Sequence, residues 1–96
     1  MMGTDMLFAI HYTAHPNANT KADITALMTE FGKRGEVAGT IGHYVYPGGG
    51  GFVIVDQEVS VVYETVTAYG EWLEFDVRPL LTIDDAVPHI MSYIGA

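Results

Sequence analysis

The chain has 96 residues, the size of a single domain, and a net charge of −8. This charge argues against a nucleic-acid or anionic-membrane ligand, because only four basic residues oppose twelve acidic ones. The absence of cysteine excludes disulfides, thiolate metal sites and thiol nucleophiles. No apolar run reaches the roughly 20 residues of a membrane span and the start has no signal-peptide pattern, so we expect a cytoplasmic protein.

The first third of the chain predicts a strand followed by a helix. The run MLFAIHYT (6–13) is apolar and aromatic and ends at the turn-prone AHPNAN, which is typical of a strand. Thr20 precedes a capping-box-like start with Asp23 three residues later. Apolar side chains then recur on one helical face, at Ile24, Leu27, Met28 and Phe31. Gly32 and Gly35 are expected to end this helix.

The middle of the chain predicts a hairpin and a second helix. Residues 37–46 and 52–55 are expected to be strands joined through Gly48–Gly51. A phosphate-binding loop would instead need a helix after the glycines, usually with a lysine, and here FVIV follows. Residues 59–69 have helical spacing of their apolar side chains although valine and threonine, which favour strands, are frequent there. We therefore predict a helix, with Ser60 as its cap.

The last third predicts an edge strand and an amphipathic helix. LEFDVRPLL (73–81) alternates in polarity, and Pro79 restricts it to an edge or ends it. Thr82 and Asp85 form a capping-box pattern before apolar residues at helical spacing. Pro88 lies within this segment, so the helix is expected to kink or to restart there.

The chain resembles a family of short bacterial proteins known only as a domain of unknown function. The resemblance rests on three segments that occur in this order: MLFAIHYT, GGFVIVD and EFDVRPLL. The predicted β-α-β-β-α-β order plus a final helix also resembles the dimeric α+β barrel superfamily, which includes ferredoxin-like monooxygenases and muconolactone-isomerase-type proteins. The resemblance implies a single α+β ferredoxin-like domain over residues 1–96. It supplies no catalytic residues, and the activities of the superfamily are an expectation from fold analogy alone.

The alternation of the strands places several polar side chains on one sheet face. His11 lies on one face of the first strand, while Asp76 and Arg78 share a face of the last. In a ferredoxin-like sheet these strands are antiparallel neighbours, so the three side chains are predicted to cluster away from the helices. A carboxylate beside an imidazole can make a general acid or base, with His11 and Asp76 as the catalytic pair. The alternative is a surface ion pair of little energetic value.

Two tyrosines and a histidine pair complete the candidate residues. Tyr44 and Tyr46 share a strand face and are predicted to bind substrate together with Arg78, or to anchor a dimer interface. His11 and His15 are four residues apart, but a turn separates them and zinc needs three or four converging ligands. We therefore predict no metal site and no cofactor.

These patterns leave three functional hypotheses open. The first is an enzyme of the isomerase, cyclase or cofactor-free oxygenase type, acting on a small apolar or aromatic molecule. The second is a non-catalytic ligand-binding or regulatory module, and the third is a purely structural dimer. A homodimer is expected in each case, because strand 52–55 is apolar on both faces and the few helices of one chain cover only one of them.

Overall fold

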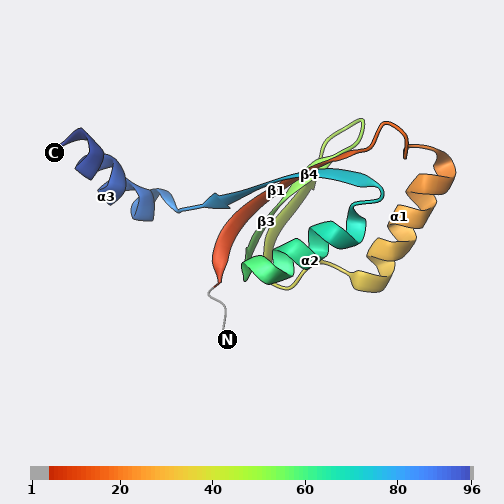
Figure 1. Cartoon of the computed structure of the whole chain (residues 1–96), viewed down its shortest axis with the longest axis horizontal. Helices are drawn as coiled ribbons and strands as arrows, with labels where there is room; N and C mark the ends of the chain where they lie inside the picture. The colour runs from red at the N-terminus through yellow and green to blue at the C-terminus, as the bar shows by residue number, and fades with distance from the viewer. Residues whose placement is uncertain (1–4, 96) are drawn as a thin grey trace.

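The structure, a computed structural model, describes residues 5–95. Its elements follow the order β-α-β-β-α-β-α (Figure 1). Their bounds are β1 Met6–Ala14, α1 Lys21–Arg34, β2 Thr40–Val45, β3 Gly51–Gln57, α2 Val59–Tyr69, β4 Leu73–Leu80 and α3 Ile83–Ile94. The predicted order of elements is confirmed, while the second strand begins at Thr40 and not at residue 37.

The four strands form one antiparallel sheet in the order β2-β3-β1-β4, which is compatible with a ferredoxin-like fold. β1 is central and pairs with both β3 and β4: Ile10 lies opposite Val53 on one side and opposite Val77 on the other. β4 is an edge strand, as Pro79 requires, since proline has no amide hydrogen to donate to a second neighbour. This order places the end of β1 beside the start of β4.

The helix ends follow local signals in the sequence. Thr20 caps α1 with a complete capping box to Asp23. Gly35 ends the helix with a positive φ of 70°, whereas Gly32 lies within it, so the expectation that Gly32 also ends the helix was wrong. The Thr82 hydroxyl caps α3 by accepting from the backbone amide of Asp85. The expected cap of α2 was wrong: its N-cap is Glu58, and the Ser60 hydroxyl donates to the Glu58 carboxylate.

α2 forms despite its strand-favouring composition. Its Val62 and Tyr69 side chains are buried, and packing therefore outweighs the weak propensity of valine and threonine for strands. The hydroxyls of Thr65 and Thr67 donate to the carbonyls of Val61 and Tyr63, one turn earlier. Each of these two threonines thus satisfies its hydroxyl within the helix.

The glycine run is the loop of the β2–β3 hairpin, as predicted. Gly48, Gly49 and Gly50 all have positive φ, between 82° and 109°, which side chains other than glycine rarely adopt. The Tyr46 amide donates to the Gly50 carbonyl and closes the loop onto β3. No helix follows these glycines, so the geometry of a phosphate loop is not formed here.

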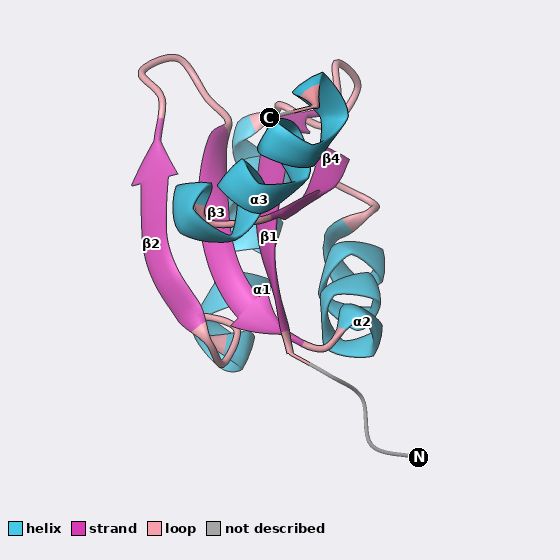
Figure 2. Ribbon diagram, turned by 90° about the vertical axis from the view of Figure 1, so that its left-hand side faces the viewer, coloured by secondary structure: helices cyan, strands magenta, loops and turns pink. Residues whose placement is uncertain are grey.

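The core lies on one side of the sheet, beneath α2. Its five buried members come from β1, β3 and α2: Phe8, Ile10, Val53, Val55 and Val62. Figures 1 and 2 place α1 and α2 on this side and leave the other face of the sheet without a helix packed on it. We call that second face the helix-free face.

α3 stands apart from the rest of the molecule (Figure 1). It projects on the helix-free side, beyond the end of β4, and Figure 2 shows it in front of the sheet while α1 and α2 lie behind. The chain is accordingly elongated, with extents of 55 × 33 × 19 Å. Pro88 lies inside α3 in a helix that runs unbroken from residue 83 to 94, so the predicted restart does not occur.

Candidate functional site

An aromatic cluster lies on the helix-free face where the neighbouring strands β1, β3 and β2 meet. Phe52 of β3 lies at its centre, opposite Tyr44 of β2 on one side and His11 of β1 on the other. Its ring centroid is 5.4 Å from that of His11, 5.2 Å from that of Tyr44 and 6.0 Å from that of Tyr46. These distances are typical of stacked and tilted aromatic pairs. We call these four residues the aromatic platform.

The platform is open to solvent in the single chain. Tyr44 is 60% exposed and Tyr46 is 47% exposed, while Phe52 is half-buried. Large aromatic groups seldom gather in solvent without a partner or ligand, because their burial is favourable by about 1.5–3 kcal/mol per side chain. The platform is therefore a plausible contact surface on physical grounds.

The predicted polar residues lie on the same face, next to the platform. His11 and Asp76 are direct partners across the β1–β4 pair, and Arg78 follows two residues later on the same face. The Arg78 guanidinium donates to Asp76 at 3.1 Å (Nε to Oδ2), but the two side chains are 72% and 56% exposed. Among the described residues no hydrogen bond joins the His11 ring to Asp76. In the single chain this is thus a solvated ion pair, which contributes little to stability.

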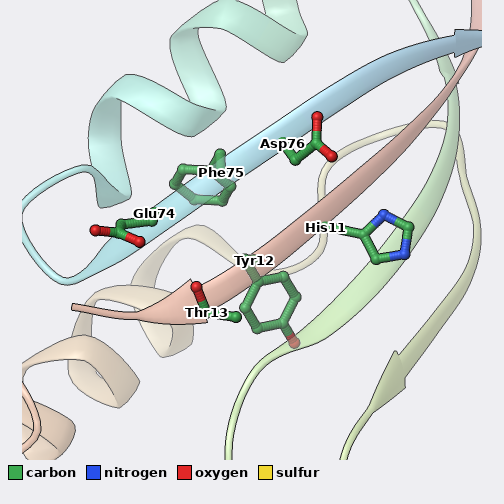
Figure 3. A pocket seen from close by; sticks show the side chains of 6 residues that line it. All are labelled: His11, Tyr12, Thr13, Glu74, Phe75 and Asp76. Carbon is green, nitrogen blue, oxygen red and sulfur yellow. The ribbon is translucent and has the colours of Figure 1, made fainter. Parts of the chain in front are cut away.

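A depression of about 190 Å³ lies between β1 and β4 beside these residues (Figure 3). It is lined by His11, Tyr12, Thr13, Glu74, Phe75 and Asp76. The side chains of His11 and Asp76 come from neighbouring strands and border it together. A hollow of this size holds only part of a drug-sized ligand, because typical binding pockets enclose about 300–1,000 Å³. A second surface is needed to enclose a ligand here.

A hydrogen-bonded chain on the opposite face was not anticipated from the sequence. The Tyr12 hydroxyl lies 2.6 Å from His43 Nε2, and His43 Nδ1 lies 2.6 Å from Glu36 Oε1. A carboxylate only accepts, so Nδ1 carries the proton and Nε2 of the neutral ring accepts from the Tyr12 hydroxyl. The ring of Phe31 packs edge-on against His43. This chain links the segment after α1 to β2 and β1.

Burial and a nearby charge act on Tyr12. Partial burial raises the pKa of its phenol above 10.0, and the carboxylate of Glu36 raises it further. Tyr12 therefore keeps its proton at neutral pH and acts as a donor to His43. Because Tyr12 also lines the depression, the chain reaches from the helix-covered side of the sheet to the edge of the site.

The possible pairing of His11 with His15 is not formed. His15 instead lies 3.2 Å from Glu74 (Nδ1 to Oε1) and 3.0 Å from the Gly70 carbonyl (Nε2 to O). These contacts tie the turn after β1 to the turn before β4. Across residues 5–95 no three histidine, aspartate or glutamate side chains converge as metal ligands would.

The sequence was compared with known proteins. It matches the family described as Domain of unknown function (DUF3303) over residues 6–94. The chain belongs to this family. Neither the search of curated proteins nor the search of solved structures gave a match.

The family assignment agrees with the resemblance to a short domain of unknown function and adds no activity to it. None of the helices described for this DUF3303 protein is long and apolar enough to cross a membrane.

Proposed function

We propose that this DUF3303 protein is a homodimer that binds a small aromatic molecule on the helix-free face, enclosed by the second chain as in dimeric α+β barrels. The observation that carries the proposal is the aromatic platform, where three rings lie within 6.0 Å of Phe52 beside a cation and a carboxylate. A planar ligand stacks on such a surface without requiring a deep pocket.

The polar residues define the ligand further. Arg78 is the only basic residue in the last 60 residues of the sequence, and its planar guanidinium binds two oxygens of a carboxylate or enolate together. A ligand with one acidic group can replace Asp76 as the partner of Arg78. We therefore infer an aromatic molecule of low mass with a carboxylate or an acidic hydroxyl.

Proton-transfer chemistry is the second part of the proposal. Asp76 lies directly opposite His11 across the β1–β4 pair, and directly opposed side chains on one sheet face are close enough to interact. His11 would then remove or return a proton on the bound molecule, with Asp76 orienting the ring. This chemistry suits an isomerase, a cyclase or a cofactor-free oxygenase. A binding or regulatory module would use the same face without turnover, and a structural dimer would not bind a ligand there.

Calorimetric titration with benzoate, salicylate and their uncharged amides tests the binding proposal. Arg78→Gln is expected to weaken binding of the acids by about tenfold or more, because a charge-assisted pair contributes about 1.5–3 kcal/mol. Arg34→Gln is the matched control, since Arg34 pairs with Glu30 on α1, away from the site. Equal affinity for acids and amides, or equal losses in both variants, would contradict the role of Arg78.

His11→Asn separates catalysis from binding. Because benzoate and salicylate have no C–H that enolises, the probe here is phenylpyruvate, an aromatic acid with an enolisable benzylic C–H. If His11 transfers a proton, the native protein speeds solvent-deuterium exchange at that carbon above its rate in buffer, followed by NMR, and this variant keeps its affinity for phenylpyruvate but loses the added exchange. Added exchange that persists in His11→Asn would leave the binding module as the function. Absence of binding by every acid in the native protein would leave the structural dimer.

A further inference from the structure

α3 carries an apolar stripe that none of the elements described for residues 5–95 covers. The stripe consists of Ile83, Val87, Ile90, Met91 and Ile94, which repeat along one side of the helix. All five are exposed, between 42% and 71%. The opposite side carries polar residues, including Asp85 and Ser92. An amphipathic helix with this pattern normally packs its stripe against another surface.

The exposed area of the chain is larger than that of a compact protein of the same mass, which indicates that a large surface is available to a partner. A compact folded chain of 10.5 kDa exposes about 5,430 Å², whereas this chain exposes 6862 Å². The excess of about 1,430 Å² exceeds the roughly 800 Å² that each partner buries in a stable protein interface. The radius of gyration is likewise 16.0 Å, against about 12.5 Å for a compact domain of this length.

α3 continues from β4 and does not fold back onto its own sheet (Figure 1). Leu80 is still paired with Leu7, and only Leu81 and Thr82 separate it from the helix. Thr82 is extended (ψ 157°) and its hydroxyl caps α3 in this orientation. In this conformation the stripe of α3 stays away from its own sheet.

We propose that the occupant is a second copy of this chain, and that α3 of each copy packs its stripe against the helix-free face of the other. Each uncovered apolar surface then meets one of matching character: the stripe of α3 lies over the aromatic platform of the partner, and the proposed ligand is held between the two. The site of one chain is incomplete without the α3 helix of the other. This inference rests on the proposed location of the site, but not on the identity of its ligand.

Sedimentation equilibrium with two charge variants tests the exchange. Ile90→Asp places a carboxylate in the middle of the stripe and is expected to weaken the dimer at least about 100-fold, because it removes the burial of a large side chain and adds a buried charge. Ser92→Asp adds the same charge to the polar side of the same helix and is expected to leave the dimer unchanged. A native protein that is monomeric at micromolar concentration, or an Ile90→Asp variant that dimerises as tightly as Ser92→Asp, would overturn the proposal.

A spin-label measurement does not depend on either charge variant folding. The chain has no cysteine, so Ser92→Cys accepts a single nitroxide on the polar side of α3. The labelled chain at natural isotope abundance is refolded with native ¹⁵N-labelled chain, and broadening of the amide signals of Tyr44 and Phe52 in the ¹⁵N chain is expected. Their survival at full intensity would refute the exchange.

The two proposals can fail separately. A dimer with cross-chain broadening and no affinity for aromatic acids would retain the exchange of α3 and remove the ligand. Binding of aromatic acids without cross-chain broadening would retain the ligand and remove the exchange.

Discussion

The hydrogen-bonded chain of Tyr12, His43 and Glu36 predicts energetic coupling that a double-mutant cycle can measure. Tyr12→Phe removes the hydroxyl and leaves His43 Nε2 without its donor, at an expected cost of about 1 kcal/mol in free energy of unfolding. His43→Leu replaces the imidazole by an apolar side chain and leaves the half-buried Tyr12 hydroxyl without its acceptor, at an expected cost of about 1–3 kcal/mol in free energy of unfolding. Glu36 is 45% exposed, so water solvates its carboxylate when His43 is replaced, and the loss of this hydrogen bond adds little to the cost in free energy of unfolding.

The double variant decides whether these costs share one origin. With both polar partners removed, no half-buried group is left unpaired, and the combined loss should fall about 1 kcal/mol or more below the sum of the single losses. Urea denaturation at one fixed protomer concentration measures all four corners, because dimer stability depends on concentration. Tyr93→Phe is the control, since Tyr93 is 91% exposed. Additive losses within about 0.3 kcal/mol would show that the chain contributes no coupling.

Three further predictions follow from the described side chains. The Tyr69 hydroxyl is buried without a hydrogen-bond partner among residues 5–95, so Tyr69→Phe should leave urea stability unchanged or raise it by about 1 kcal/mol; a clear loss would reveal a hidden partner. Burial raises the pKa of Tyr12 above 10.0, so stability is fully present below that pH and is lost as the pH rises from 10.0 through the folded-state pKa. Tyr12→Phe should therefore flatten the decline in thermal stability at alkaline pH, and an unchanged decline would contradict this. Gly50→Ala should lower the free energy of unfolding more than Gly49→Ala. Both glycines have positive φ, but only at Gly50 would the new methyl meet the Tyr12 carbonyl oxygen, at 2.7 Å. Neither substitution should affect nucleotide affinity, and measurable ATP or NAD binding by the native protein would refute that expectation.

Much of the fold was predictable because its signals are local. The capping box at Thr20 and the glycine loop each depend on a few neighbouring residues, and both form as predicted. Of the capping box predicted at Thr82, the structure has the bond from the Asp85 amide to the Thr82 hydroxyl. The helical assignment of residues 59–69 required weighing spacing against composition, and burial of Val62 and Tyr69 explains why spacing prevailed. The error at Ser60 concerned only the cap: the helix begins at Val59, as its spacing predicts, and the residue before it, Glu58, is the N-cap.

Part of the site was likewise predictable from the alternation of side chains along the strands, and part was not. Strand alternation places His11, Asp76 and Arg78 on one face, and the register shows that His11 and Asp76 are direct partners. Their role in catalysis or binding stays a prediction. The contact of His43 with Tyr12 and Glu36 depends on how the segment after α1 meets the sheet. No spacing in the sequence encodes that approach.

The orientation of α3 could not be predicted from the sequence either, for a different reason. The pattern from Ile83 to Ile94 predicts an apolar side but not the surface that covers it, and the hydrophobic effect has no directional preference between a chain's own sheet and that of another copy. The structure places α3 beyond the end of β4, away from its own sheet.

Enclosure by a second chain would change the energetics of the ion pair on the helix-free face. In solvent, Asp76 and Arg78 gain little from their 3.1 Å contact, and His11 has water on its exposed side. Covered by the α3 helix of the partner, the same charges would lose hydration, and one salt bridge compensates for that loss only with additional hydrogen bonds. An acidic ligand between Arg78 and His11 supplies such bonds, so ligand binding and dimer formation are expected to strengthen each other. The dimer dissociation constant of the native protein should therefore fall when salicylate is added, whereas that of Arg78→Gln should not. A native dissociation constant that is independent of salicylate, although calorimetry shows binding, would separate the ligand from the interface.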